Sequence, residues 1–192
     1  MIKAVITDFD GTLVDTFEAN LAAYQKVLGD LGIVLTREKY RECFGFRFDA
    51  FMAVLGVDDE QTRERIKDAK MALYPSYFEK LIPNRTLIGF LEMLKASGVK
   101  IAIASTARKE NLMNVLSYLG LTDLFDLILA GVNVSNGKPD PEIYNLTMER
   151  LGVSPEDVLI FEDSDVGLQA ADASGAKYIR VTEDFFKYEI RG

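Results

Sequence analysis

Short apolar runs without strict polar alternation recur along the chain, and such runs are typical of strands buried on both faces of a sheet. Between the later runs, apolar residues recur with the period of an amphipathic helix, and these stretches end near glycines. We predict strands at residues 4–7, 99–104, 127–130, 158–161 and 178–181, and helices at residues 87–96, 110–119, 141–151 and 165–173. The alternation predicts an α/β fold, in which a doubly wound parallel sheet is covered by helices on both faces.

Residues 17–80 interrupt this alternation, because they carry helical patterns and no convincing strand. The first pattern begins at Phe17, and others cover residues 37–43, 48–55 and 59–80. Pro75 lies inside the last pattern and should kink or break it. A segment of about 64 residues is too long for a simple crossover connection. We therefore expect a core domain made of residues 1–16 and 81–192, with an all-helical cap domain, residues 17–80, inserted into it.

The composition excludes several kinds of chemistry. The chain has no histidine, so it cannot carry a Ser-His-Asp or Cys-His nucleophile system or a zinc site that depends on imidazole. Its 22 basic and 30 acidic residues leave a formal net charge of −8, which argues against nucleic acid or an anionic membrane surface as a partner. Any hydrolysis must therefore depend on carboxylates, hydroxyls, amines or a metal.

The cellular context is also limited by the sequence. The single cysteine, Cys43, cannot form an intrachain disulfide, so the fold does not need an oxidising compartment. No apolar run approaches the length that crosses a bilayer, and the first strand begins too early to leave room for a signal peptide. We expect a cytoplasmic protein, with a monomer as the default state.

Distinctive polar residues follow the ends of four predicted strands: Asp8 with Asp10, Ser105 with Thr106, Lys138, and Glu162 with Asp163. In a doubly wound sheet the ligand crevice lies outside the carboxyl ends of the strands, so these residues should converge. Carboxylates without histidine suit Mg²⁺, a lysine supplies positive charge for an anion, and a serine hydroxyl supplies a hydrogen bond. Phosphoryl transfer needs this combination, because cations must stabilise the charge that develops on the transferred group.

Four segments carry a resemblance to a known family. DFDGTLVDT, IAST, GKPDPEIY and FEDSDVGLQAA match, in order, the four motifs of the haloacid dehalogenase-like hydrolase superfamily. The chain is most similar to the branch that holds relatives of β-phosphoglucomutase and phosphoglycolate phosphatase, which carry a helical cap after the first motif. The resemblance implies a Mg²⁺-dependent phosphatase that hydrolyses a small phosphorylated metabolite, such as a sugar phosphate or phosphoglycolate, through an aspartyl-phosphate intermediate.

The resemblance also implies a role for each motif residue. Asp8 would be the nucleophile and a metal ligand, and Asp10 would be the general acid and base, with its backbone carbonyl on the metal. Asp163 would be a metal ligand, and Glu162 a ligand or a residue just behind one. Ser105 and Lys138 would hold the phosphoryl oxygens. The other candidates for substrate binding are Gly11, Thr12, Thr16 and Thr106 and, in the cap, Arg47 and Lys70.

Several alternative functions stay open, and single residues bear on them. Asn20 stands where mutase members of the branch carry a histidine, which favours a phosphatase over a phosphosugar mutase. Asp10 argues against dehalogenase chemistry, and no cap lysine can be singled out as the Schiff-base lysine of a phosphonatase. A response-regulator receiver also combines a phosphate-accepting aspartate with Mg²⁺ and a lysine, but its parts come in another order and it lacks a helical insert.

Individual candidates also have plainer interpretations as helix caps or solvated charges, which apply to Ser105, Lys138, Asp140, Glu142, Arg47 and Lys70. Ser105 would then cap the helix after its strand, and Asp140 would cap a helix with Pro141 as its first residue. Asn84 stands where a turn glycine is common in the family. We expect that change to alter the hinge and not the chemistry.

Overall fold

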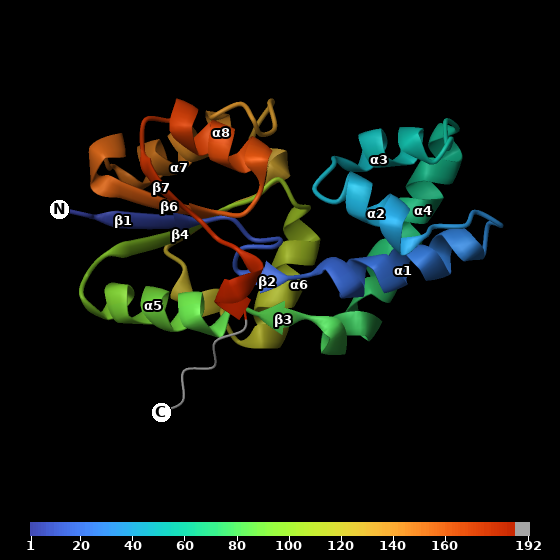
Figure 1. Ribbon diagram of the computed structural model, residues 1–192, viewed down its shortest axis with the longest axis horizontal. Helices are drawn as coiled ribbons and strands as arrows, with labels where there is room; N and C mark the ends of the chain where they lie inside the picture. Colours follow the sequence, from blue (N-terminus) through green and yellow to red (C-terminus); the bar gives the residue numbers. More distant parts are fainter. Residues whose placement is uncertain (187–192) are drawn as a thin grey trace. The chain divides into compact units, whose positions relative to one another are not determined.

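The computed structural model describes residues 1–186, so residues 187–192, the end of the predicted core domain, lie outside the described part. Two compact units divide the chain, one made of Met1–Asp15 with the chain from Ile82 onward and the other of Thr16–Leu81. The first unit is α/β and the second is helical (Figure 1). No helix among residues 1–186 is long and apolar enough to cross a membrane.

A sheet of five parallel strands forms the centre of the first unit, in the order β5–β4–β1–β6–β7. The strands are β1 (Ala4–Thr7), β4 (Lys100–Ala104), β5 (Leu127–Leu129), β6 (Val158–Glu162) and β7 (Lys177–Arg180). All four residues of β1 are buried, as expected for a central strand that is covered on both faces. The predicted strands and the doubly wound parallel architecture are confirmed.

Four helices of the described chain cover the sheet (Figure 1). Helices α5 (Arg85–Ala96) and α6 (Lys109–Leu119) lie on one face, and α7 (Glu142–Leu151) and α8 (Asp165–Ala173) on the other. Right-handed crossovers produce this division, because the chain moves outward from β1 in one direction and then returns in the other. Short 3₁₀ helices lie in the connections, at η2 (Thr122–Leu124), η3 (Gly131–Asn133) and η4 (Pro155–Asp157), and a further one, η5 (Glu183–Phe186), follows β7.

Two details of the first unit differ from the prediction. Strands β2 (Val14–Asp15) and β3 (Ile82–Pro83) pair in antiparallel fashion, and two-residue strands are too short to show alternation in the sequence. Helix α7 begins at Glu142 with Pro141 as its N-cap, so the prediction of Asp140 as the cap was wrong. The Asp140 carboxylate still accepts a hydrogen bond from the Glu142 N–H at 2.9 Å, and it therefore supports the first turn from outside.

The second unit is built from helices, as predicted. They are α1 (Phe17–Gly29), α2 (Arg37–Cys43), α3 (Phe48–Val54), α4 (Glu60–Leu73) and the 3₁₀ helix η1 (Tyr74–Lys80). Helix α4 ends at Leu73, and Pro75 falls in the first turn of η1. The predicted break at this proline is confirmed, since proline fits a first turn but not a helix interior.

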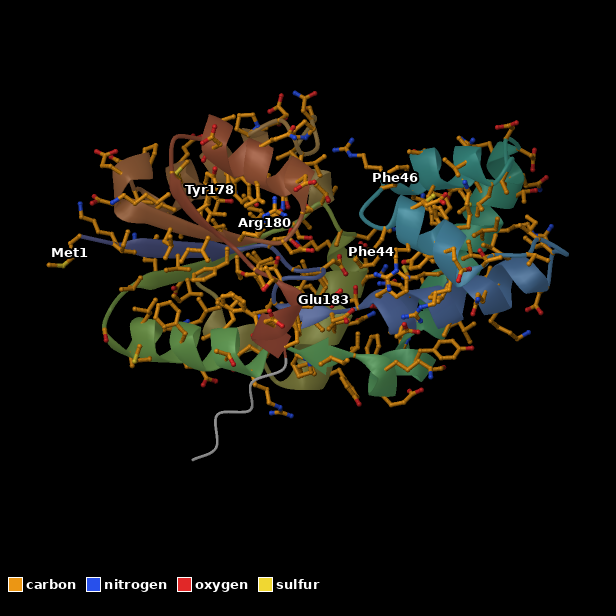
Figure 2. The ribbon with its side chains drawn as sticks, viewed as in Figure 1. Met1, Phe44, Phe46, Tyr178, Arg180 and Glu183 are labelled. Carbon is orange, nitrogen blue, oxygen red and sulfur yellow. The ribbon has the colours of Figure 1, made fainter. Side chains whose placement is uncertain are left out.

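Aromatic rings fill the interior of the second unit. The Tyr40 ring centroid lies 5.1 Å from that of Phe17 and 5.6 Å from that of Phe51, at tilted and edge-to-face angles. Phe44 and Phe46 lie in the loop between α2 and α3 (Figure 2). Phe44 packs against this core, whereas Phe46 is 53% exposed. The loop therefore has one aromatic anchor and one exposed aromatic side chain.

Asn84 connects α5 to the loop that follows β1. Its Oδ1 accepts a hydrogen bond from the Leu87 N–H at 3.0 Å, which caps the helix. Its Nδ2 donates to the Thr12 carbonyl oxygen at 3.0 Å, and its backbone N–H donates to the Leu13 carbonyl oxygen at 2.9 Å. The side chain is completely buried. Asn84 thus does the work of a helix cap and of a loop anchor.

Asn84→Ala is expected to lower the free energy of unfolding by about 2–3 kcal/mol, because it removes the cap and leaves the Thr12 carbonyl without its buried donor. Urea unfolding followed by circular dichroism measures the change. Asp59→Ala is the matched control, because Asp59 caps α4 through the Thr62 N–H at an exposed position, and it should cost only about 1 kcal/mol. Equal losses in the two variants would contradict the anchoring role of Asn84.

Candidate active site

The strand register brings the first and last sequence motifs together. Thr7 of β1 pairs with Phe161 of β6, and the Asp8 N–H donates to the Phe161 carbonyl oxygen at 2.9 Å. Asp8 and Glu162 therefore leave neighbouring strands at the same end of the sheet, where both side chains are buried. The parallel arrangement explains the convergence, because all carboxyl ends meet at one edge.

Lys138 reaches this edge from the loop between β5 and α7. Its Nζ donates to Asp8 Oδ1 at 2.6 Å and to Glu162 Oε1, and its side chain is 5% exposed. The interpretation of Lys138 as an ordinary solvated lysine was therefore wrong. Burial alone would lower the pKa of Lys138, but attraction to Asp8 and Glu162 raises that pKa well above its ordinary value. The lysine is a fixed positive charge.

Three carboxylates gather around this lysine. Asp8, Glu162 and Asp163 each place an oxygen within 4.8 Å of the others. Burial raises the pKa of Asp8 well above its usual value, and burial together with Glu162 raises the pKa of Asp163 to about 6. Burial is the main cause of both shifts, and the neighbouring carboxylates add to it because three acids share one ammonium group here. A hard divalent cation fits this cluster, since it would balance the remaining charge and is bound by carboxylate oxygens.

The loop after β1 shapes the position of Asp163. Gly11 has φ +85°, and a Cβ at that position would overlap the Asp163 carboxylate. The Thr12 hydroxyl is buried and donates to Asp163 Oδ1 at 2.8 Å. Both residues were predicted as candidates for substrate binding, and their contacts here are with Asp163. Asp10 lies between them and β1, half-buried, with Val14 as its bridge partner.

Ser105 and Thr106 follow β4 at the same edge of the sheet. The Ser105 hydroxyl oxygen accepts a hydrogen bond from the Ala107 N–H at 3.1 Å, and its side chain is buried. Helix α6 begins later, at Lys109, with Arg108 as its N-cap. Ser105 therefore closes a short turn and does not cap the helix. Its hydroxyl hydrogen stays available for an acceptor, because the oxygen serves that turn through a lone pair.

Two residues that hold the site at this edge of the sheet, Glu142 and Tyr144, were not predicted from the sequence to do so. Glu142, interpreted as a residue that only begins a helix, accepts hydrogen bonds from the Ser135 N–H at 2.9 Å and the Asn136 N–H at 2.7 Å. It thereby ties down the loop that carries Lys138. Tyr144 is completely buried and donates from its hydroxyl to Glu162 Oε1 at 3.1 Å. An acid and an aromatic residue in the first turn are both ordinary in helices, so no signal in the sequence marked Glu142 or Tyr144.

The remaining candidates belong to the second unit. Thr16 precedes α1 and is buried, and Arg47 precedes α3 and is exposed. Lys70 is 5% exposed, and its Nζ donates to Asn20 Oδ1 at 2.7 Å and lies 3.7 Å from the Tyr74 ring centroid. The interpretation of Lys70 as part of a solvated helix face was therefore wrong. An ammonium group over an aromatic ring is stabilised by a cation–π interaction.

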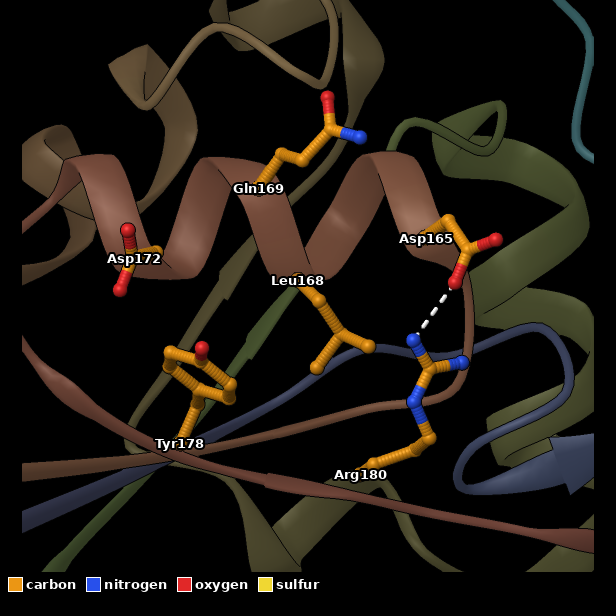
Figure 3. A pocket seen from close by; sticks show the side chains of 6 residues that line it. All are labelled: Asp165, Leu168, Gln169, Asp172, Tyr178 and Arg180. Carbon is orange, nitrogen blue, oxygen red and sulfur yellow. Dashed lines mark hydrogen bonds and ion pairs between the residues drawn. The ribbon is translucent and has the colours of Figure 1, made fainter.

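A separate groove of about 300 Å³ lies between α8 and β7 (Figure 3). Its lining residues are Asp165, Leu168, Gln169, Asp172, Tyr178 and Arg180, and no predicted site residue is among them. Arg180 donates to Asp165 Oδ1 at 2.6 Å and to the Asp163 carbonyl oxygen at 3.2 Å. Arg180, one of the residues that line the groove, therefore ties β7 to the segment that carries Asp163.

Gly167→Ala is expected to destabilise the protein by about 2–4 kcal/mol, because a Cβ at this position in α8 would overlap the buried Glu162 carboxylate. The thermal unfolding midpoint, followed by circular dichroism, measures the effect. Gly29→Ala is the matched control at the end of α1, where nothing lies within 4 Å of the added Cβ, and it should be neutral or stabilise by up to about 1 kcal/mol. An unchanged midpoint in Gly167→Ala would refute this placement of Glu162.

The chain is similar to known proteins in sequence and in fold. The family model described as haloacid dehalogenase-like hydrolase matches residues 5–181. A phosphorylated carbohydrates phosphatase of Thermotoga maritima is 35% identical over 93% of this chain and 84% of its own length, and a β-phosphoglucomutase of Bacillus subtilis is 30% identical over 91% and 80%. The crystal structure of CbbY from Rhodobacter sphaeroides in complex with phosphate is similar with a TM-score of 0.86, at 27% identity over 98% of this chain and 90% of that one.

Proposed function

Because this chain belongs to the haloacid dehalogenase-like hydrolase family, we propose that it is a Mg²⁺-dependent phosphatase that hydrolyses a small phosphorylated metabolite, a sugar phosphate in the first place. The observation that carries the proposal is the pairing of Asp8 with a buried Lys138 at 2.6 Å, beside two further carboxylates. A carboxylate nucleophile and a phosphate repel each other, and the fixed ammonium reduces that repulsion. The Thermotoga relative is named a phosphorylated carbohydrates phosphatase, and this name favours carbohydrate phosphates over phosphoglycolate as substrates.

The proposed reaction has two steps. An oxygen of Asp8 attacks the phosphorus atom, the bond from phosphorus to the ester oxygen breaks, and Asp10 gives its proton to the leaving alcohol. Asp10 then takes a proton from water, the water oxygen attacks phosphorus, and the bond to Asp8 breaks to release inorganic phosphate. Ser105 and Lys138 donate hydrogen bonds to the phosphoryl oxygens in both steps, with Gly11, Thr12 and Thr106 forming the nearby walls.

The metal would be held by Asp8, Asp163 and the backbone carbonyl of Asp10, and Glu162 lies close enough to be considered with them. When bound, Mg²⁺ supplies positive charge that offsets the repulsion between the nucleophile and the phosphate. The chain's own part is to fix the ligands: Thr12 holds Asp163 through a hydrogen bond, and Gly11 leaves room for its carboxylate.

A phosphosugar mutase is the alternative, and one of the relatives bears such a name. Asn20 argues against it, because its amide oxygen accepts a hydrogen bond from Lys70 and an amide acts neither as an acid nor as a base near neutral pH. Asn20 can position a charged group but cannot replace a proton-transferring histidine. We therefore favour transfer to water over transfer to a second sugar hydroxyl.

The cap is proposed to select the substrate. Lys70, Arg47 and Thr16 are its candidates for contact, and Lys70 is held in place by Asn20 and Tyr74. A lysine ammonium in such surroundings suits an anionic or hydroxyl-rich group. We also propose a cytoplasmic monomer without nucleic acid or membrane partners, which the net charge of −8 and the single, buried Cys43 support.

Removal of the metal is expected to abolish the activity. With Mg²⁺, the protein should release phosphate from at least one member of a panel of sugar phosphates and other monoesters. EDTA should lower the rate by at least about 100-fold, and excess Mg²⁺ should restore it, because the carboxylate cluster then regains its counter-charge. A rate that is indifferent to EDTA, or no release from any monoester, would contradict the proposed function.

A further inference from the structure

We propose that Glu162 is the anchor of Lys138 and not a metal ligand, and that Tyr144 is a positioning residue that fixes this anchor. The inference rests on the proposed function for its meaning in catalysis, but its geometry is independent of the substrate. The two acids of the last motif would then have different roles, and only Asp163 would bind the metal.

Each carboxylate oxygen of Glu162 accepts two hydrogen bonds. Oε1 accepts from Lys138 Nζ and from the Tyr144 hydroxyl at 3.1 Å. Oε2 accepts from the Ser164 N–H at 3.0 Å and from the Ser164 hydroxyl at 3.2 Å. A carboxylate offers about four lone-pair positions, so four donors leave none for a cation. Glu162 is also 0% exposed, so it offers no open surface at which a metal ion could reach the carboxylate.

Asp8 and Asp163 differ from Glu162 in this respect. Among the described residues, the Asp8 side chain receives one hydrogen bond, from Lys138, and the Asp163 side chain receives one from another residue, Thr12, beside an interaction with its own backbone N–H. Each aspartate therefore keeps acceptor positions that a metal ion can use. Of the three neighbouring carboxylates, Asp8 and Asp163 would therefore bind the metal, and Glu162 would balance the charge of Lys138.

The backbone of α8 holds the Glu162 carboxylate from below. Gly167 lies so close that an added Cβ would overlap both carboxylate oxygens. Ser164, which begins the same helix, donates two hydrogen bonds to the carboxylate and also caps α8 through the Gly167 N–H at 3.0 Å. The carboxylate therefore has neither space nor unmet hydrogen bonds that would favour rotation toward Asp163.

Tyr144 contacts both partners of the anchor. Its hydroxyl donates to Glu162, and its ring centroid lies 5.0 Å from Lys138 Nζ. Lys138 is thus placed by two carboxylates and an aromatic face before any substrate arrives. Loss of the hydroxyl alone would keep the ring and its packing, while the anchor would lose one of its four donors. We expect such a loss to affect the chemical step more than substrate or metal binding.

Tyr144→Phe tests the positioning role in the full chain. With the best substrate of the monoester panel, kcat should fall about 10-fold while KM changes less than about twofold. Tyr178→Phe, which removes an exposed hydroxyl from β7, is the control and should leave both constants unchanged. The ¹⁵N resonance of the Lys138 ammonium, assigned with Lys138→Met, should shift or broaden in Tyr144→Phe only. An unchanged kcat with an unchanged lysine resonance would overturn the role of Tyr144.

Mn²⁺ binding, measured by electron paramagnetic resonance, tests the separation of the two acids. Asp163→Asn should weaken Mn²⁺ binding at least about 100-fold, whereas Glu162→Gln should weaken it no more than about fivefold. Equal weakening by the two variants would make Glu162 a ligand and overturn the inference. Neither the resonance nor the Mn²⁺ titration needs a substrate, so a failure of the proposed function would appear only in the kinetics.

Discussion

Asp8→Asn is expected to lower kcat for phosphate release by at least about 10⁴-fold. The substitution removes the attacking carboxylate, and an amide of the same shape is a poor nucleophile. It also removes a buried carboxyl group whose pKa is raised by desolvation and by the neighbouring Glu162 and Asp163. The variant should therefore fold at least as well as the wild type. If Asp8 is the nucleophile, the variant should therefore lose activity without losing stability.

Steady-state phosphate release and urea unfolding measure the two halves of this prediction. Asp172→Asn is the control, because Asp172 is an exposed aspartate of α8 that lines the separate groove. It should change neither quantity. Activity of Asp8→Asn within tenfold of the wild type would exclude Asp8 as the nucleophile.

Lys138→Met is expected to lower kcat/KM by about 10³-fold and to destabilise the protein by about 3–5 kcal/mol. Both effects have one cause, since Asp8 and Glu162 would face each other in a buried site without their shared ammonium. Enzyme kinetics and urea unfolding report them separately. In the double variant Lys138→Met with Glu162→Gln, part of the stability should return because one unpaired charge is removed, but the activity should not.

Lys95→Met provides the comparison for a lysine that is not part of the site. Lys95 is partly exposed, donates to the carbonyl oxygens of Asp123 and Leu124 and pairs with Asp126. Its loss should cost no more than about 1–2 kcal/mol and leave kcat/KM unchanged. Similar stability losses for the two lysines would contradict the buried triad of Asp8, Lys138 and Glu162.

The architecture of the core could be predicted because its central strands are apolar on both faces. β1 is buried at every residue, and a short, continuous apolar run of this kind is typical of a strand in the middle of a parallel sheet. The pair of β2 and β3 could not be predicted, because two residues carry no periodic signal. The start of α7 was misplaced by one residue for a similar reason: Asp140 and Pro141 fit a helix start in either register, and only the observed hydrogen bonds distinguish them.

The site could be predicted as a set of residues but not as a set of contacts. The order of the motifs placed Asp8, Lys138 and Asp163 at one edge of the sheet, since strand ends converge there. Whether Thr12 faces a ligand or Asp163 depends on the packing of loops that are far apart in the sequence. Tyr144 is still harder to find, because a buried aromatic in a helix usually signals packing alone. Its role depends on where its hydroxyl points.

Asp8 is proposed to form a covalent bond to phosphorus during turnover, and chemical trapping of the aspartyl-phosphate detects that bond. The enzyme is mixed with its best monoester substrate, quenched in acid and reduced with borohydride, which converts an aspartyl-phosphate to homoserine. Asp10→Asn is mixed instead with an aryl phosphate, whose leaving group needs no proton from residue 10, and because this variant lacks the group that activates water it should accumulate the intermediate. Mass spectrometry should find homoserine at position 8 in this variant and not in Asp8→Asn. Substrate turnover without modification at position 8, or with modification at another aspartate, would contradict it.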